Sequence, residues 1–487
     1  MKSSLVDLTT LTIRELSSLI SSRKISCVEL IDQTLGKIRR LNPMLNAFIT
    51  ITEDSARRDA KHADSLIRRG KYLGPLHGIP ISVKDLIYIK GVRSTSGSKI
   101  LSDFVPTYDS TVITKLRSAG AIIVGTNNTH EFACGITNIN PHFGSSINPW
   151  DTTRISGGSS GGSAVAVSAG MSSATIGTDT SGSIRVPSSL CGIFGLKPTY
   201  GRVSKYGVMP LAPSIDHIGP LARSAWDIAA ILKIIAGHDP HDGSSAAVPV
   251  PDYLKDISRK TSLLAANGSE KSKSKGFKLA IPKQFFFDII DPKVMDVFTE
   301  FVEKITACGI STSRVDMKST EKIVDTWRAF RLGESAATHS EWVSARRQDY
   351  GDDVIKMLDK GMQITAVQYI NAHKWKEEIK QSFLRAVEGY DAMLVPTTII
   401  PAPLLNQNEV NIGDKMHEVY PSLSRLTTVF DVTGLPALNV PAGFVGDGLP
   451  VGVQLVGRPF EESQILKIAY IYEQYYKLQG QLMPPIQ

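Results

Sequence analysis

The chain has 487 residues, of which 42% are hydrophobic, 21% charged and 7% aromatic. This balance is that of an ordinary globular protein and excludes wholesale disorder and a coiled coil. The longest apolar stretches, such as residues 228–236, fall short of the roughly 20 apolar residues that a spanning helix needs, so we expect no membrane association. The length allows several domains or one large α/β layer structure.

The net charge of +7 comes from 54 basic and 47 acidic residues. A good part of the excess lies in a segment rich in Ser, Lys and Gly, and this composition predicts a flexible loop over residues 258–277. No basic patch interleaved with aromatic residues accompanies the charge. We therefore expect no direct binding of nucleic acid.

The four cysteines are widely spaced and form no CxxC pair; they are Cys27, Cys134, Cys191 and Cys308. The spacing indicates neither a disulfide framework nor a zinc site, so we expect buried, reduced thiols and no metal. Near the N-terminus, Asp7, Arg14 and Glu15 interrupt any apolar region that export would require. The expected location is the cytoplasm.

Apolar residues recur at intervals of three and four through the first part of the chain, which predicts a helical cap over residues 1–70. Ile79, Ile81 and Val83 then alternate with polar residues or proline, and strand-like and helix-like segments follow one another in a core over residues 72–225. A variable region of longer helices and loops is expected over 240–420, and short strands return over 421–487. This order indicates one doubly wound α/β domain, in which strands from both ends of the chain complete a single sheet.

The densest signal is the run from Ser156 to Leu196, SGGSSGGSAVAVSAGMSSATIGTDTSGSIRVPSSLCGIFGL. Such small residues let backbone amides approach a reacting atom closely. The run continues into a hydrophobic helix and a strand-like ATIG, which disfavours a flexible linker. It lacks the Gly-Lys-Ser/Thr ending of a phosphate-binding loop and a GxGxxG with a following acid, which disfavours nucleotide binding.

Residues Gly157–Gly161 also fit the pattern G-x-S-x-G, which in an α/β-hydrolase would make Ser159 the nucleophile. That fold needs an acid and then a histidine later in the chain, and no later histidine lies in a comparably distinctive context. The pattern therefore remains the weaker alternative.

The segments GGSSGGSAVAVSAG and GTDTSGSIRVPSSLCGIFGLKPTYGRVS, with PLHGIPISVKD upstream, resemble the amidase signature family. SIDHIGPLARS and GLPVGVQLVGRPF match the family as well, so the resemblance covers most of the chain. It implies an α/β fold with a single large mixed central sheet covered on both sides by helices. It also implies a cofactor-independent amidase.

The resemblance places the base on Lys84, a bridging serine after a cis peptide bond on Ser159, and the nucleophile on Ser183. Burial lowers the pKa of a lysine by as much as 3–5 units, which would let Lys84 accept a proton. Taken alone, Lys84 would be a surface partner of Asp85, but residues adjacent on a strand point to opposite faces.

By resemblance, the oxyanion donors are the backbone amides of Thr180, Ser181, Gly182 and Ser183, and Ala133 of HEFACG lies near the scissile group. Ser181 departs from the glycine that the family more often has there, which we expect to narrow the site. Asp179 and Arg185 flank the nucleophile, and we expect them to form ion pairs that hold the loop.

We therefore expect hydrolysis of the C–N bond in a linear, small-molecule carboxamide through a serine acyl-enzyme. The alternative within the family is the A subunit of a tRNA-dependent glutamine amidotransferase, which makes ammonia for a partner protein. These A subunits carry an acid, suited to the α-ammonium of glutamine, where this chain has Ser424. They carry an Arg-Arg pair, suited to the carboxylate, where this chain has Lys356-Met357; in this chain, Arg425 is a substitute for binding the carboxylate. These differences favour an independent hydrolase, with a homodimer left open. A catalytically silent scaffold is disfavoured by the three retained triad residues.

Overall fold

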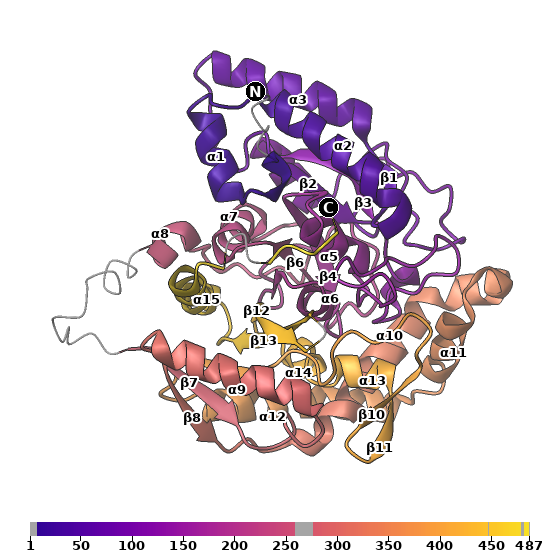
Figure 1. Cartoon of the computed structure of the whole chain (residues 1–487). Coiled ribbons are helices and arrows are strands. Elements are labelled where there is room, and N and C mark those ends of the chain that lie inside the picture. The colour runs from indigo at the N-terminus through magenta and orange to yellow at the C-terminus, as the bar shows by residue number, and fades with distance from the viewer. Residues whose placement is uncertain (1–6, 259–275, 447, 479–481, 487) are drawn as a thin grey trace, which may run out of the picture.

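The computed structural model describes residues 7–258, 276–446, 448–478 and 482–486 (Figure 1). Within them, one sheet of 11 strands runs through the molecule. Its strands are, in spatial order, β1 (Phe48–Ile51), β3 (Ile122–Asn127), β2 (Pro80–Lys84), β4 (Ala174–Asp179), β6 (His217–Ala222), β5 (Phe194–Lys197), β12 (Ala437–Val445), β13 (Leu449–Val456), β9 (Ala392–Pro396), β7 (Lys278–Pro282) and β8 (Ser311–Val315). A separate hairpin joins β10 (Glu409–Ile412) to β11 (Lys415–Glu418).

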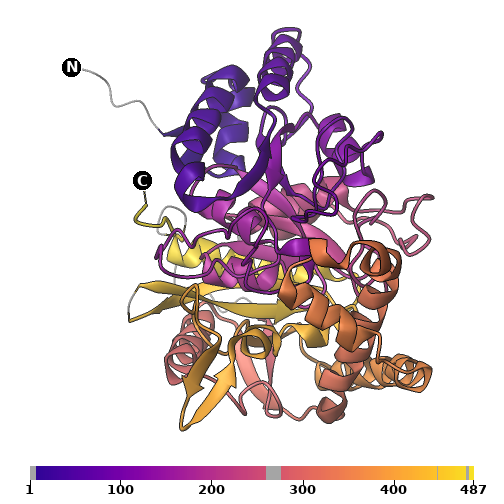
Figure 2. The same cartoon turned by 90° about the vertical axis from the view of Figure 1, so that its right-hand side faces the viewer.

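Helices cover the sheet on both sides (Figures 1 and 2). They are α1 (Ile13–Ser21), α2 (Cys27–Leu45), α3 (Glu53–Arg68), α4 (Thr111–Ser118), α5 (Gly161–Ser168), α6 (Arg185–Leu190), α7 (Ala225–Ile235), α8 (Tyr253–Ser258), α9 (Pro292–Ala307), α10 (Ile323–Arg346), α11 (Asp352–Gly361), α12 (Ala366–Ala386), α13 (Val419–Ser424), α14 (Thr428–Thr433) and α15 (Glu462–Tyr476). Within the described residues, no helix is both long enough and apolar enough to cross a bilayer.

The sheet is mixed, as expected. β2 runs parallel to both β3 and β4, β7 runs parallel to β8 and β9, and the central pairs from β4 to β9 are antiparallel. β2 was predicted from alternation, yet all five of its residues are buried, because it has a strand on each side and helices on its faces. This burial is what encloses Lys84 at its end.

Six strands lie in ranges where the sequence predicts helices or loops, and among them are β9, β10 and β11 of the variable region 240–420. β1 falls inside the expected helical cap 1–70 and pairs with β3, while β7 and β8 fall inside the variable region 240–420 and form the opposite edge. β1 and β7 are mostly apolar and β8 is mostly polar, so none of the three shows a clear alternation of apolar and polar residues. Of the predicted flexible loop 258–277, residues 259–275 lie outside the described residues.

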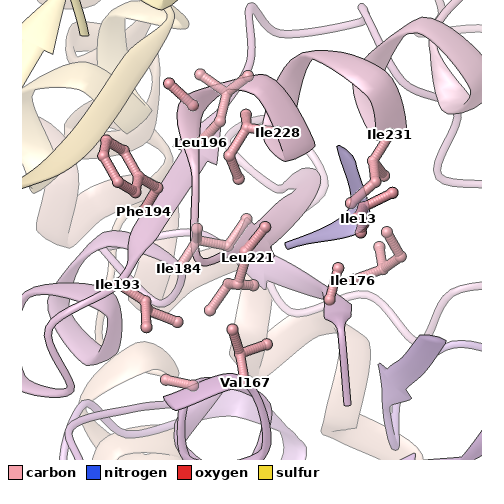
Figure 3. Packing of buried hydrophobic residues seen from close by; sticks show 14 of the residues in the cluster. Ile13, Val167, Ile176, Ile184, Ile193, Phe194, Leu196, Leu221, Ile228 and Ile231 are labelled. Atoms are coloured by element: carbon pink, nitrogen blue, oxygen red, sulfur yellow. The ribbon is translucent and has the colours of Figure 1, made fainter. Parts of the chain in front are cut away.

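The Gly-rich run folds into α5, β4 and α6 at the centre of the molecule. Figure 3 shows how Val167 of α5, Ile176 of β4 and Ile184 before α6 pack with Leu221 and Ile228 into one apolar cluster. All eight residues of α5 are buried. Close packing on both sides holds the loops at the ends of these elements in fixed positions.

Candidate active site

Lys84 lies at the carboxyl end of β2 and is fully buried. Its Nζ is 2.6 Å from Ser159 Oγ and 2.7 Å from Thr178 Oγ1. Burial lowers the pKa of Lys84 to about 7, although Asp179 and Asp216 act in the opposite direction. Near neutral pH, a substantial fraction of Lys84 is therefore the uncharged amine, which accepts protons.

Asp85 is not the partner of Lys84. Its Oδ2 accepts hydrogen bonds from the Thr95 amide at 2.8 Å and from Thr95 Oγ1 at 2.5 Å. Asp85 is fully buried, and burial raises its pKa to about 6. The alternative of a surface ion pair between Lys84 and Asp85 is therefore wrong.

Ser159 stands in the turn before α5, and the peptide bond that joins Gly158 to it is cis, as the resemblance implies. Its carbonyl accepts hydrogen bonds from Thr129 Oγ1 at 2.9 Å and from the His130 amide at 3.3 Å. Both fix the backbone and leave the hydroxyl facing Lys84. Among the described hydrogen bonds, no histidine contacts the Ser159 hydroxyl, which disfavours the G-x-S-x-G alternative.

Ser183 lies on the loop between β4 and α6. The Ser160 amide donates to the Ser183 carbonyl at 3.2 Å, so the residue after Ser159 is bonded directly to Ser183. Ser183 is 3% exposed. The fold thus brings Lys84, Ser159 and Ser183 together from β2, the turn before α5 and the loop after β4.

Asp179 organises the backbone amides of this loop. Its carboxylate accepts hydrogen bonds from the amides of Gly182 at 2.6 Å and Ile184 at 3.1 Å. In the part of the chain that the structure describes, the amides of Thr180, Ser181 and Ser183 donate to no protein acceptor. The Gly182 amide is therefore occupied by a hydrogen bond within the loop, whereas the amides of Thr180, Ser181 and Ser183 have no protein acceptor among the described residues.

Arg185 forms a buried ion pair with Asp179. Its Nε and Nη2 lie 3.0 and 3.1 Å from the two Asp179 oxygens, and Nη2 also lies 2.7 Å from Asp431. All three side chains are fully buried. Burial by itself raises the pKa of Asp179, but the Arg185 guanidinium outweighs it and holds this pKa well below its usual value. The expected loop-holding ion pair is confirmed.

Ser181 adopts a conformation that a side chain tolerates, because the positive φ of this loop, 111°, falls on Gly182. The Ser181 carbonyl accepts from Thr427 Oγ1 at 2.6 Å, and its hydroxyl accepts from Trp327 Nε1 at 2.8 Å. Substituting serine for the usual glycine therefore adds a hydrogen bond between the loop and α10.

Ala133 ends a short 3₁₀ turn, Glu131–Ala133, with φ of 59°. It lines a cavity of about 130 Å³ together with Thr178 and Thr180. Ala133 therefore shares a cavity with Thr178, whose hydroxyl contacts Lys84, and with Thr180, whose backbone amide is free.

Sequence reasoning missed three residues of this site. Thr178, which contacts Lys84, could have been suspected because it lies in the same GTDTSGS segment as Thr180. Trp327 and Thr427 lie 146 and 246 residues from Ser181. No local pattern connects them to the loop that carries Ser183.

The described residues contain no cluster of three or more His, Cys, Asp or Glu side chains that could hold a metal ion. All four cysteines are free and buried.

Known proteins resemble this chain over nearly its whole length. The chain is 37% identical to the A subunit of the Glutamyl-tRNA(Gln) amidotransferase of Geobacter metallireducens, over 96% of this chain and 98% of that protein. It is also 37% identical to the protein of the same name from Heliobacterium modesticaldum, over 96% of each.

Two solved structures with similar chains are described in different terms. One belongs to a vestigial protein complex described as revealing the evolutionary origins of an s-triazine catabolic enzyme, with a TM-score of 0.89, 30% identity, and coverage of 98% of this chain and 100% of that one. Another is the A subunit of the Glutamyl-tRNA(Gln) amidotransferase of Thermotoga maritima, with a TM-score of 0.81, 32% identity, and coverage of 99% and 98%.

A model of the amidase family matches residues 29–466. The buried Lys84–Ser159 contact and the Gly-rich loop that carries Ser183 lie inside this range. The chain therefore belongs to the amidase signature family and is an amidohydrolase that acts on carbon–nitrogen bonds of amides.

Proposed function

We propose that this chain hydrolyses a linear carboxamide through an acyl-enzyme on Ser183, without a cofactor. The observation that carries the proposal is the 2.6 Å contact between Lys84 Nζ and Ser159 Oγ in a buried site. A serine is a poor nucleophile until a base takes its proton, and a lysine with a pKa of about 7 is such a base.

The proton moves in a relay. Neutral Lys84 takes the proton of Ser159 while Ser159 takes that of Ser183, whose Oγ bonds to the carbonyl carbon. The carbonyl electrons move to the oxygen, which accepts hydrogen bonds from the amides of Thr180, Ser181 and Ser183. The proton returns through Ser159 to the nitrogen, the C–N bond breaks, and ammonia or an amine leaves. Water then attacks the ester by the same relay and releases the carboxylate.

We expect kcat/KM to rise with pH. Below pH 7 Lys84 is mostly an ammonium, so kcat/KM should fall about tenfold for each pH unit below about 6, and it should level off above pH 8. The measurement is kcat/KM between pH 5 and 9, with circular dichroism at each pH to confirm that the protein stays folded. A rate that stays flat from pH 5 to 7 would contradict the role of Lys84.

For the substrate we propose a small amide that the chain hydrolyses alone. An amidotransferase chain that binds glutamine would need an acid for the α-ammonium, and this chain has Ser424 at that position. Ser424 lines a cavity of about 240 Å³ with Trp327, and its hydroxyl donates to the Tyr420 carbonyl at 3.2 Å. A missing partner for a buried charge weakens binding by about tenfold or more.

The names of the relatives favour a second candidate, the A subunit of a tRNA-dependent amidotransferase, in which the same chemistry would release ammonia from glutamine for a partner protein. The two candidates are distinguished by measuring kcat/KM of the purified chain for glutamine and for aliphatic and aryl amides. We expect simple amides to exceed glutamine. Strong preference for glutamine, stimulated by a tRNA-binding partner, would establish the second candidate.

We also propose that the chain works in the cytoplasm. Free, buried cysteines without disulfides are typical of a reducing compartment.

A further inference from the structure

The loop that carries Ser183 is anchored at Ser181 by two segments that are distant in sequence. Thr427 Oγ1, next to α14, donates to the Ser181 carbonyl at 2.6 Å, and Trp327 Nε1, on α10, donates to the Ser181 hydroxyl at 2.8 Å. A side chain at Gly182 would place its Cβ 2.2 Å from Thr427 Oγ1, so Thr427 packs directly against the loop. Two anchors on different groups of Ser181 fix its orientation more firmly than either anchor alone, because supporting hydrogen bonds restrict the available conformations.

The Ser181 amide belongs to the residue that both anchors hold. It is one of the three amides of this loop that donate to no protein acceptor within the described residues, and it is a proposed oxyanion donor. Such a donor is effective when its nitrogen lies about 2.7–3.1 Å from the position that the charged oxygen takes. A small rotation of Ser181 would therefore misdirect the amide. The bond from Trp327 restricts this rotation through the hydroxyl.

Arg331 holds the indole of Trp327 in place. The two residues lie four positions apart on α10, and the Arg331 guanidinium lies 5.5 Å from the centre of the Trp327 ring, within the range of a cation–π contact. Arg331 is buried, and its Nη2 donates to the Cys134 carbonyl at 2.5 Å. Rotation of the indole away from Ser181 would break the contact with this fixed cation. The N–H donor is therefore held in position before a substrate binds.

The position of α10 does not depend on the bond to Ser181. Its buried residues pack the helix against the rest of the fold, and they are Ile323, Thr326, Ala329, Phe330, Arg331, Ser335, Ala336 and His339. Trp327 is only half-buried and lines the cavity of about 240 Å³. A half-buried indole N–H needs no protein acceptor, because water can satisfy it, yet this one donates to Ser181. The bond therefore fixes the loop rather than the helix.

We propose that Trp327 is a positioning residue of the amidase reaction: through Ser181, it directs the Ser181 amide toward the oxygen that becomes negative when Ser183 attacks. This inference rests on the proposed amidase function. The negative charge on that oxygen develops in the transition state and is absent from the bound amide. Removing the bond between Trp327 and Ser181 should therefore lower kcat and leave KM nearly unchanged, whereas a lost binding contact would raise KM.

The first test removes this bond from each end. Trp327→Phe keeps an aromatic ring in the cavity wall and removes the N–H, and Ser181→Ala removes the acceptor from a residue that does not line the cavity. We expect kcat on the best amide substrate to fall at least about fivefold in each variant, the factor that corresponds to the loss of one ordinary hydrogen bond. In Ser181→Ala, KM should stay within about twofold of the wild type. A smaller fall of kcat in either variant, or a loss confined to KM, would overturn the proposal.

The double variant shows whether the two residues act through one bond. Because both substitutions break the same bond, the chain with Trp327→Phe and Ser181→Ala together should have a kcat within about twofold of the lower single variant. Two effects that multiply would mean that Trp327 and Ser181 act separately, and the positioning role would be wrong.

Trp150→Phe is a matched control. Trp150 is half-buried as well, and its Nε1 donates to the Cys191 carbonyl at 2.9 Å. The substitution removes an equal bond that does not involve Ser181, so kcat should stay within about twofold of the wild type. A fall as large as that in Trp327→Phe would show that the loss of any such indole bond has this effect, which would also overturn the proposal.

Labelling with a fluorophosphonate separates this inference from the proposed function. In this reaction Ser183 Oγ bonds to phosphorus, its proton passes to the relay, and fluoride leaves; the phosphoryl oxygen uses the same amides, and no amide substrate is needed. We expect the second-order rate constant of labelling to fall at least about fivefold in Trp327→Phe and in Ser181→Ala, but not in Trp150→Phe. If the wild type hydrolyses no amide and the labelling rates fall in this way, the proposed function fails and the role of Trp327 stands. If amides are hydrolysed and the labelling rates fall less, the role of Trp327 fails alone.

Discussion

Replacing Ser183 with alanine should lower kcat/KM by at least about 10⁴-fold, the range seen when the nucleophile of a serine hydrolase is removed. In the proposed mechanism the variant loses the oxygen atom that forms the acyl-enzyme, so the free amides of the loop have no oxyanion to stabilise. Ser159→Ala should also be severely impaired, because it breaks the relay between Lys84 and Ser183. The measurement is steady-state kcat/KM on the best amide of the panel.

Ser188→Ala is a matched control. Ser188 is a buried serine of α6 whose hydroxyl donates to the Ile184 carbonyl at 2.7 Å, so its loss removes a hydrogen bond and no reacting group. Its kcat/KM should stay within about threefold of the wild type. A fluorophosphonate should label Ser183 in the wild type. Labelling of Ser159 that spares Ser183 would reverse their roles and support the G-x-S-x-G alternative.

Replacing Arg185 with methionine should destabilise the chain by about 3–5 kcal/mol, the cost of removing one partner from a buried ion pair. The Asp179 and Asp431 side chains, both 0% exposed, would then remain buried without the Arg185 cation. Asp179 would also lose the charge that holds its pKa low, and with it the anionic form that binds the amides of Gly182 and Ile184. Activity should therefore fall with stability.

The measurement is the denaturation midpoint in urea, followed by circular dichroism and by residual activity. Arg347→Met is the control: Arg347 forms a paired contact with Asp359 as well, but both side chains are about half exposed, and water screens such pairs. A midpoint shift in Arg185→Met no larger than in this control would show that the buried pair contributes nothing to stability.

The residues of the proposed relay could be assigned from sequence because each lies in a short motif that resembles the family. Lys84 ends a strand in which apolar residues alternate with proline or polar residues, and Ser159 and Ser183 flank the helix and strand of one Gly-rich run. The chemistry of the loop followed from backbone amides, which depend on chain conformation more than on side chains. Asp179 and Arg185 were predicted to hold the loop because charged residues next to a Gly-rich turn commonly anchor it, and the structure pairs the two directly.

Contacts between distant segments could not be predicted. Trp327 reaches Ser181 across 146 residues, and Arg331 reaches Cys134 across 197. A helical pattern shows that α10 exists, but not which of its side chains faces the nucleophile loop. The strands β1, β7 and β8 escaped detection for a related reason: their sequences show no clear alternation, and each strand is stabilised by a neighbour in the sheet that is remote in sequence.

Trp327 and Arg331 lie four residues apart on α10, so one face of one helix carries both the hydrogen bond to Ser181 and the buried guanidinium. A shift of this helix by a fraction of an ångström would move both. A substitution on this face of α10 would therefore also disturb the loop that carries the proposed oxyanion donors. Within this lineage, a new substrate range should arise through paired substitutions, one on α10 and one at Ser181, rather than through changes at the cavity wall alone.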